Sequence, residues 1–217
     1  MKWTELADRV MITFDKSNEN RYKILKFLSE GENDFACYTK CYEKEYSTTI
    51  SDFSSGVALP DDFMELSSSP TWGGVLLSKH NNEINKINSG GTIVTGIPRF
   101  YYIERDTLQF VPKPTSSNVL QFLYIATPNN DATDTFAYES SDSTMLQKPS
   151  IPQAYHIYLI DYAKAMMYEE VGNYELADRL LRRYYSHRDV VRAEHTNRDY
   201  GNEFALVSDL SYIDIDI

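Results

Sequence analysis

The spacing of apolar residues changes twice along this 217-residue chain, from helical to alternating and back to helical. This order constrains the fold more than any other feature, because a period near 3.6 predicts helices and a period of two predicts strands. The alternating part lies between the two helical parts. We therefore expect an α+β fold, in which N-terminal helices and a C-terminal α-hairpin form a helical bundle with an inserted antiparallel β domain.

The first third of the chain has the pattern of two helices. Residues 4–14 form a short amphipathic segment, and a longer apolar stripe runs from about residue 18 to residue 42. Ser17 or Asn18 is placed to cap this second helix. Gly31 lies inside the stripe, where glycine costs about 1 kcal/mol relative to alanine. It predicts either a bend or the close approach of another backbone.

The middle of the chain carries the strand signals. Two alternating runs, residues 100–104 and 107–111, flank a two-residue polar turn and predict a β-hairpin. Residues 119–125 supply another alternating strand, and residues 47–53 are β-prone. Residues 127–148 are polar and predict a long surface loop that faces another protein or solvent and contains no active site.

The last third predicts two antiparallel helices and a tail. Ser150 and Gln153 have the spacing of a capping box, Gly172 ends the first helix, and Asn173 caps the second. The tail carries five acidic residues and no basic residue, but it is too apolar to serve only for solubility. We divide the chain into an N-terminal helical segment (1–46), an antiparallel β-rich insertion with the polar loop (47–148), the C-terminal α-hairpin (149–198) and the acidic-apolar tail (199–217).

Charge limits the partners that this chain can have. The 32 acidic and 21 basic side chains give a formal net charge of −11, which disfavours nonspecific binding of DNA. No signal peptide and no apolar run near the ~20 residues of a membrane helix is visible, so we expect a soluble protein without membrane contact, made in a cytoplasm. The 17 tyrosines suit extensive protein contact, although a coding bias would give the same count.

Positive charge is concentrated in the second C-terminal helix. Residues 178–198 contain six arginines and three acids, which leaves a local charge of +3 in an acidic chain. This stretch is either a solvated helix face or a docking helix for an acidic partner, such as the tail of another copy. We expect Arg182 and Arg183 to dock without holding the fold. The candidate interface residues are Arg179, Arg182, Arg183, Tyr185, Arg188 and Arg192, with Phe204, Ile213 and Ile215 in the tail.

No catalytic or metal-binding arrangement is evident in the sequence. The glycine-rich phosphate loops and the Gly-x-Ser-x-Gly elbow are missing. Cys37 and Cys41 could share one helix face, but no further Cys or His stands nearby in sequence to complete a zinc site. The histidines are scattered, and the adjacent acids Asp61 and Asp62 are ordinary in an acidic chain. We expect no enzyme activity, no cofactor and no metal.

Several short motifs resemble a known family when they are taken in order. They lie at residues 35–42, 46–49, 59–63, 96–102, 108–114, 120–125 and 151–156. Their order over residues 4 to 190 resembles the head-to-tail adaptor proteins of tailed bacteriophages. The resemblance implies a virion protein, assembled in the host cytoplasm, that forms a ring, commonly of twelve copies, below the portal. Such a ring extends the DNA channel, lets DNA pass without specific binding, and offers a platform for tail or collar proteins.

Two other functions remain open at this point. Residues 172–177 resemble the turn of a tetratricopeptide hairpin and suggest a cytoplasmic scaffold or peptide-binding module, although only one copy is present. A hydrolase would need a nucleophile such as Ser143, but its nearest histidine in sequence, His156, falls in the next helix. For the tail, the alternation over residues 213–217 suggests an extended arm that adds to the sheet of another subunit.

Overall fold

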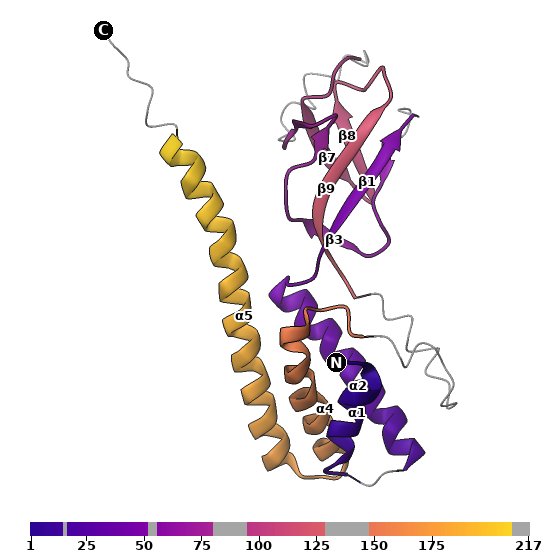
Figure 1. The fold of residues 1–217 in the computed structure, drawn as a ribbon, viewed down its shortest axis with the longest axis vertical. Coiled ribbons are helices and arrows are strands. Elements are labelled where there is room, and N and C mark those ends of the chain that lie inside the picture. The colour runs from indigo at the N-terminus through magenta and orange to yellow at the C-terminus, as the bar shows by residue number, and fades with distance from the viewer. Residues whose placement is uncertain (15–16, 52–55, 80–94, 129–147, 210–217) are drawn as a thin grey trace. The chain divides into compact units, whose positions relative to one another are not determined.

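The computed structural model of the chain describes residues 1–14, 17–51, 56–79, 95–128 and 148–209 (Figure 1). Side chains are described as far as His195. The chain divides into a helical unit, made of residues 1–42 and 128–217, and a β unit, residues 43–127. The β unit is inserted between the N-terminal and C-terminal helices. The expected α+β fold is confirmed.

The helical unit begins with two helices whose sequence patterns explain their extent. α1 (Trp3–Met11) buries Trp3, Leu6 and Val10 at helical spacing. α2 (Asn18–Thr39) starts after Ser17, whose hydroxyl accepts a hydrogen bond from the Asn20 N–H at 3.2 Å. The C-terminal part consists of the 3-10 turn η3 (Gln153–Tyr155), α4 (His156–Glu170) and α5 (Tyr174–Asp209).

The core of this unit forms where α2, α4 and α5 meet. Phe35 of α2 and Tyr184 of α5 are both fully buried, and their ring centroids lie 6.0 Å apart. Gly31 explains how closely the helices approach, because a Cβ there would lie only 2.8 Å from Cδ1 of Tyr162 in α4. The glycine thus makes room for an aromatic side chain, whereas the sequence predicted a bend or the close approach of another backbone.

The start of α4 differs from the expected capping box. The helix begins at His156, and the backbone N–H groups of Ser150 and Ile151 instead donate to Oε1 of Glu32 in α2. The Ile151 bond is 3.1 Å long. A buried carboxylate that accepts two backbone hydrogen bonds competes successfully with a local cap. The other helix boundary is as predicted: Gly172 ends α4 with φ of +76°.

The change from helix to strand comes earlier than expected. Lys40 adopts a left-handed conformation (φ 57°, ψ 30°), which ends α2 at Thr39. Strand β1 then starts at Glu43, whereas the sequence placed the change at Ser47. Cys41 therefore lies beyond the helix and does not share a helix face with Cys37.

The last helix extends into the segment that we assigned to the tail. α5 continues past residue 198 to Asp209, so Phe204 is helical and not part of an extended arm. The helix continues through Gly201, although glycine costs about 1 kcal/mol relative to alanine inside a helix. Ile213 and Ile215 lie outside the described residues, as does most of the polar loop, residues 129–147. No helix in the described parts of the chain is long and apolar enough to cross a membrane.

The β unit contains two sheets. The first has the order β1-β9-β4-β5, with β3 also paired to β9, and the second has the order β2-β8-β7-β6. Its strands are β1 (Glu43–Ile50), β2 (Val57–Ala58), β3 (Phe63–Leu66), β4 (Thr71–Trp72), β5 (Val75–Leu76), β6 (Ser78–Lys79), β7 (Phe100–Glu104), β8 (Thr107–Val111) and β9 (Asn118–Ala126).

The strand pairing follows the sequence pattern closely. The predicted hairpin is β7 and β8, with Glu104 opposite Thr107, and the predicted strand over 119–125 is β9. All strand pairs are antiparallel except β6 with β7, within the described residues. The rings of Trp72 and Phe110, one from each sheet, lie 5.2 Å apart, and both are buried. The two sheets therefore share an aromatic core.

The buried Glu32 gives a prediction about pH. Burial raises its pKa to about 7, although two backbone N–H groups oppose the shift. The folded state therefore holds this proton at pH values where the unfolded chain, with a pKa near 4.5, has released it. Glu32 should thus make the folded state less stable as the pH rises from about 5 to 8, by about 3 kcal/mol in total.

We expect Glu32→Gln to keep the acceptor oxygen but to lose this pH dependence. Urea unfolding of both proteins at pH 5 and pH 8 measures it: the free energy of unfolding of the variant should gain about 3 kcal/mol relative to the wild type between the two pH values. Glu30→Gln on the same helix, where the carboxylate is half-exposed, is the matched control. Parallel pH profiles for wild type and Glu32→Gln would contradict the prediction.

Candidate protein-protein interface

Arg183, one of the two arginines expected to dock, is held within the helical unit. Its Nε donates to Oδ2 of Asp161 at 2.6 Å, and its Nη2 donates to Oδ1 of the same carboxylate. Asp161 lies on α4 and is buried. A two-bond contact of this geometry fixes α5 against α4. Arg183 therefore contributes to the packing of the α-hairpin.

Arg188 connects α5 to α2. Its Nη1 donates to both carboxylate oxygens of Asp34, at 2.9 and 2.7 Å. The guanidinium also lies over the rings of Tyr38 and Tyr185, 3.8 and 4.7 Å from their centroids. Arg188 thus combines an ion pair with two cation–π contacts, and only 17% of its side chain is exposed.

Further contacts join the same helices around this arginine. Arg192 stacks over Tyr38 at 4.5 Å, and the Tyr38 hydroxyl donates to Asp189 at 2.7 Å. The hydroxyl of the buried Tyr184 lies 2.8 Å from Oδ2 of Asp34 and 3.0 Å from the carbonyl oxygen of Gly31. Arg188, Arg192 and Tyr185 were predicted as interface residues, and the structure places them in this α2–α5 contact.

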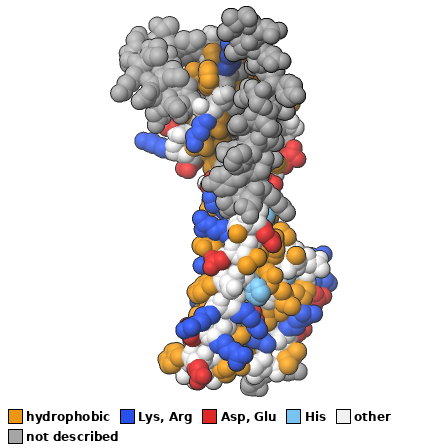
Figure 2. Space-filling model, turned by 90° about the vertical axis from the view of Figure 1, so that its left-hand side faces the viewer, with side chains coloured by type: hydrophobic (Ala, Val, Ile, Leu, Met, Phe, Trp, Pro, Cys, Tyr) orange, Lys and Arg blue, Asp and Glu red, His pale blue; other side chains and the backbone are white. Residues whose placement is uncertain are grey.

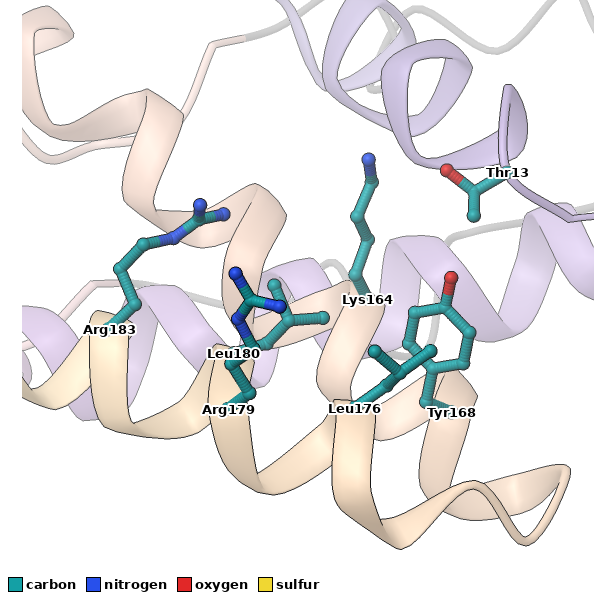
Figure 3. A pocket seen from close by; sticks show the side chains of 7 residues that line it. All are labelled: Thr13, Lys164, Tyr168, Leu176, Arg179, Leu180 and Arg183. Carbon is teal, nitrogen blue, oxygen red and sulfur yellow. The ribbon is translucent and has the colours of Figure 1, made fainter.

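Arg179 and Arg182 are the arginines of the predicted set that point away from these contacts. Arg182 is 79% exposed and pairs with Asp178 one turn earlier, at 2.8 Å. Arg179 lines a pocket of about 250 Å³ with Lys164 and Arg183 (Figure 3). Figure 2 shows Lys and Arg side chains close together on one face of the helical unit.

Sequence reasoning missed Lys164, because it lies on a different helix from the arginines. It is the only Lys or Arg in α4. A single cation in a helix whose other charged residues are acidic is the one sequence signal that could have marked it as a candidate. Of the predicted tail residues, Phe204 lies in α5 and its side chain is not described, while Ile213 and Ile215 fall outside the described residues.

The cysteines and the histidine considered for metal binding or catalysis lie in surroundings typical of structural residues. No group of three or more metal-ligating side chains occurs among the described residues. Burial raises the pKa of the Cys37 thiol, and it raises that of Cys41 to about 11, so neither is activated as a thiolate. His156 is buried, with Nδ1 3.0 Å from the N-terminal amine and Nε2 2.9 Å from the Ile151 carbonyl oxygen.

Comparison with known families identifies the class of protein. A family model described as SU10 adaptor protein matches residues 1–202, which is nearly the whole chain. The protein is therefore a structural adaptor of the bacteriophage virion and not an enzyme. No curated protein matches the sequence.

The chain belongs to the SU10 adaptor protein family, and it is a phage head-to-tail adaptor. The resemblance inferred from the ordered motifs is confirmed. The match includes both the helical unit as far as residue 202 and the whole β unit, so the α-hairpin is part of an adaptor and not an isolated tetratricopeptide-like module.

The two classes of arginine lead to a stability prediction. Arg188→Ala should lower the free energy of unfolding by about 2 kcal/mol, because it removes two charged hydrogen bonds and leaves Asp34 without its cation. Arg182→Ala, on the same helix, should change it by less than about 0.5 kcal/mol, since its ion pair is exposed. Urea unfolding of both variants beside the wild type measures the difference. Equal stability of the two variants would contradict the structural role of Arg188.

Proposed function

We propose that the protein forms a ring, commonly of twelve copies, below the portal at the head-to-tail vertex of the virion. The ring extends the DNA channel and offers a platform for tail or collar proteins. The observation that carries this proposal is the match of the adaptor family to both units of the chain. A chain with this role has to contact copies of itself, the portal above and a tail or collar component below.

Charge supports passage of DNA without specific binding. The chain has a net charge of −11. Arg183 and Arg188 are paired with Asp161 and Asp34, so their charges are locally cancelled. A channel wall drawn from such a surface repels the phosphate backbone and does not retain it.

Exposed apolar side chains support contacts with other proteins. Val171, between α4 and α5, and Tyr174, the first residue of α5, are 65% and 70% exposed, and Leu176 in the first turn of α5 is also exposed. In the β unit, Val75 and Leu76 of the β4–β5 hairpin are exposed as well. Clustered apolar residues at a turn or a hairpin tip are typical of surfaces that another subunit covers.

The assembly itself is the first test. The purified chain, alone or mixed with its cognate portal, should form a species of about ten or more copies, whose mass and symmetry are measured by native mass spectrometry and electron microscopy. A chain that stays monomeric or dimeric, and that does not bind the portal, would rule out the ring.

Arg182 is the arginine best suited to test docking, because it is highly exposed and its ion-pair partner among the described residues is the neighbouring Asp178. We expect Arg182→Glu to weaken attachment to the portal or to another copy by about tenfold while the fold is kept. Lys26→Glu is the matched control: Lys26 is also exposed and pairs one turn along its helix, with Glu30. Equal attachment of the two variants, measured by cosedimentation with portal, would exclude a docking role for Arg182.

A further inference from the structure

The pocket that contains Arg179 is built from three parts of the helical unit. Thr13 follows α1, Lys164 and Tyr168 come from α4, and Leu176, Arg179, Leu180 and Arg183 come from α5 (Figure 3). Its volume of about 250 Å³ corresponds to roughly eight water molecules. The space is therefore large enough for side chains of a partner, but small for a cofactor.

The charges of the pocket are unbalanced. Three cationic side chains line it, and no carboxylate does, among the described residues. Arg183 is compensated by Asp161, but Lys164 and Arg179 have no ion pair with any described residue. Figure 3 shows the charged ends of Lys164 and Arg179 pointing to the same side, toward the side where Thr13 lies. Two neighbouring cations without counter-charge favour an anionic partner.

The remaining lining is apolar. Leu176 and Leu180 lie one turn apart on α5, and the ring of Tyr168 lies beside Leu176 (Figure 3). A free phosphate would satisfy the cations but would leave these leucines uncovered. A peptide that presents carboxylates and aliphatic side chains together would satisfy both parts of the pocket.

We propose that this pocket binds the acidic-apolar segment 213–216 of a second copy of the chain, an inference that rests on the proposed ring. In this segment Ile213 and Ile215 alternate with Asp214 and Asp216. An extended conformation places the isoleucines along one edge and the aspartates along the other. The aspartates then meet Lys164 and Arg179, and the isoleucines cover Leu176 and Leu180.

The length of α5 requires that the segment comes from another copy. Arg179 and Asp209 lie on the same helix, 30 residues apart, which corresponds to about 45 Å along its axis. Asp214 follows Asp209 by five residues, which span at most about 18 Å when fully extended. Asp214 therefore cannot reach the pocket of its own copy, whereas in a ring every copy has a neighbour.

A charge-swap experiment on the full-length chain tests the contact. Lys164→Glu with Arg179→Glu, and separately Asp214→Lys with Asp216→Lys, should each raise the concentration at which the assembly dissociates by about tenfold or more. The variant with all four changes should return to within about threefold of the wild type, because the pairs are restored with reversed sign. A folding defect would not be rescued in this way. The measurement is analytical ultracentrifugation over a dilution series.

The control is Lys26→Glu with Lys148→Glu, which changes the charge equally at two exposed lysines of the helical unit outside the pocket. Two results would overturn the proposed contact without excluding the ring. The first is a pocket variant that assembles as well as the wild type, and the second is a variant with all four changes that does not recover assembly. If the wild type does not assemble, the proposed function fails. The pocket is then tested with a labelled peptide of residues 210–217, whose failure to bind the wild type more tightly than the pocket variant overturns the contact.

Inorganic phosphate supplies the last arm. Phosphate should bind the wild-type pocket weakly. At equal ionic strength, phosphate should displace no more of the bound peptide than sodium chloride does. If phosphate displaces it selectively, the pocket is an anion site of another kind and the assignment to the acidic segment is wrong.

Discussion

One turn of α2, residues 31–34, holds the helical unit together. Gly31 leaves room for the ring of Tyr162 and offers its carbonyl oxygen to Tyr184. Glu32 fixes the chain where it returns from the β unit, and Asp34 binds Arg188. α4, α5 and the returning segment therefore all depend on four consecutive residues. Because each contact needs a different atom of this turn, a change that shifts the turn disturbs all of them together.

The periodic parts of the fold were predictable from the sequence. α1, the β7–β8 hairpin, β9 and the turn at Gly172 all follow local patterns of apolar spacing or turn residues. The start of α4 was not predictable. The N–H groups of Ser150 and Ile151, at the start of the predicted capping box, donate instead to Glu32, which is more than a hundred residues away in sequence. The end of α2 depends on a left-handed Lys40, a conformation that its residue type does not suggest.

The candidate site was only half visible from the sequence. The concentration of arginine in α5 marks the helix, but it does not say which arginines are free. Arg183 and Arg188 are bound because Asp161 and Asp34 lie on other helices, and only the tertiary fold shows this. The same fold brings Lys164 beside Arg179. Residues that the sequence groups by composition are thus divided by the structure into those that hold the bundle and those that face outward.

The length of α5 has a consequence for symmetry. With 36 residues the helix is about 54 Å long, and it carries the cationic pocket near one end and leads into the acidic segment at the other. A donor surface and an acceptor surface on opposite ends of one rod cannot satisfy each other in an isolated copy. The contact that we propose between two copies is therefore heterologous, and in an assembly built from it each added copy presents a new donor and a new acceptor. Growth then stops only when the last copy meets the first, so the rotation between neighbours sets the number of subunits.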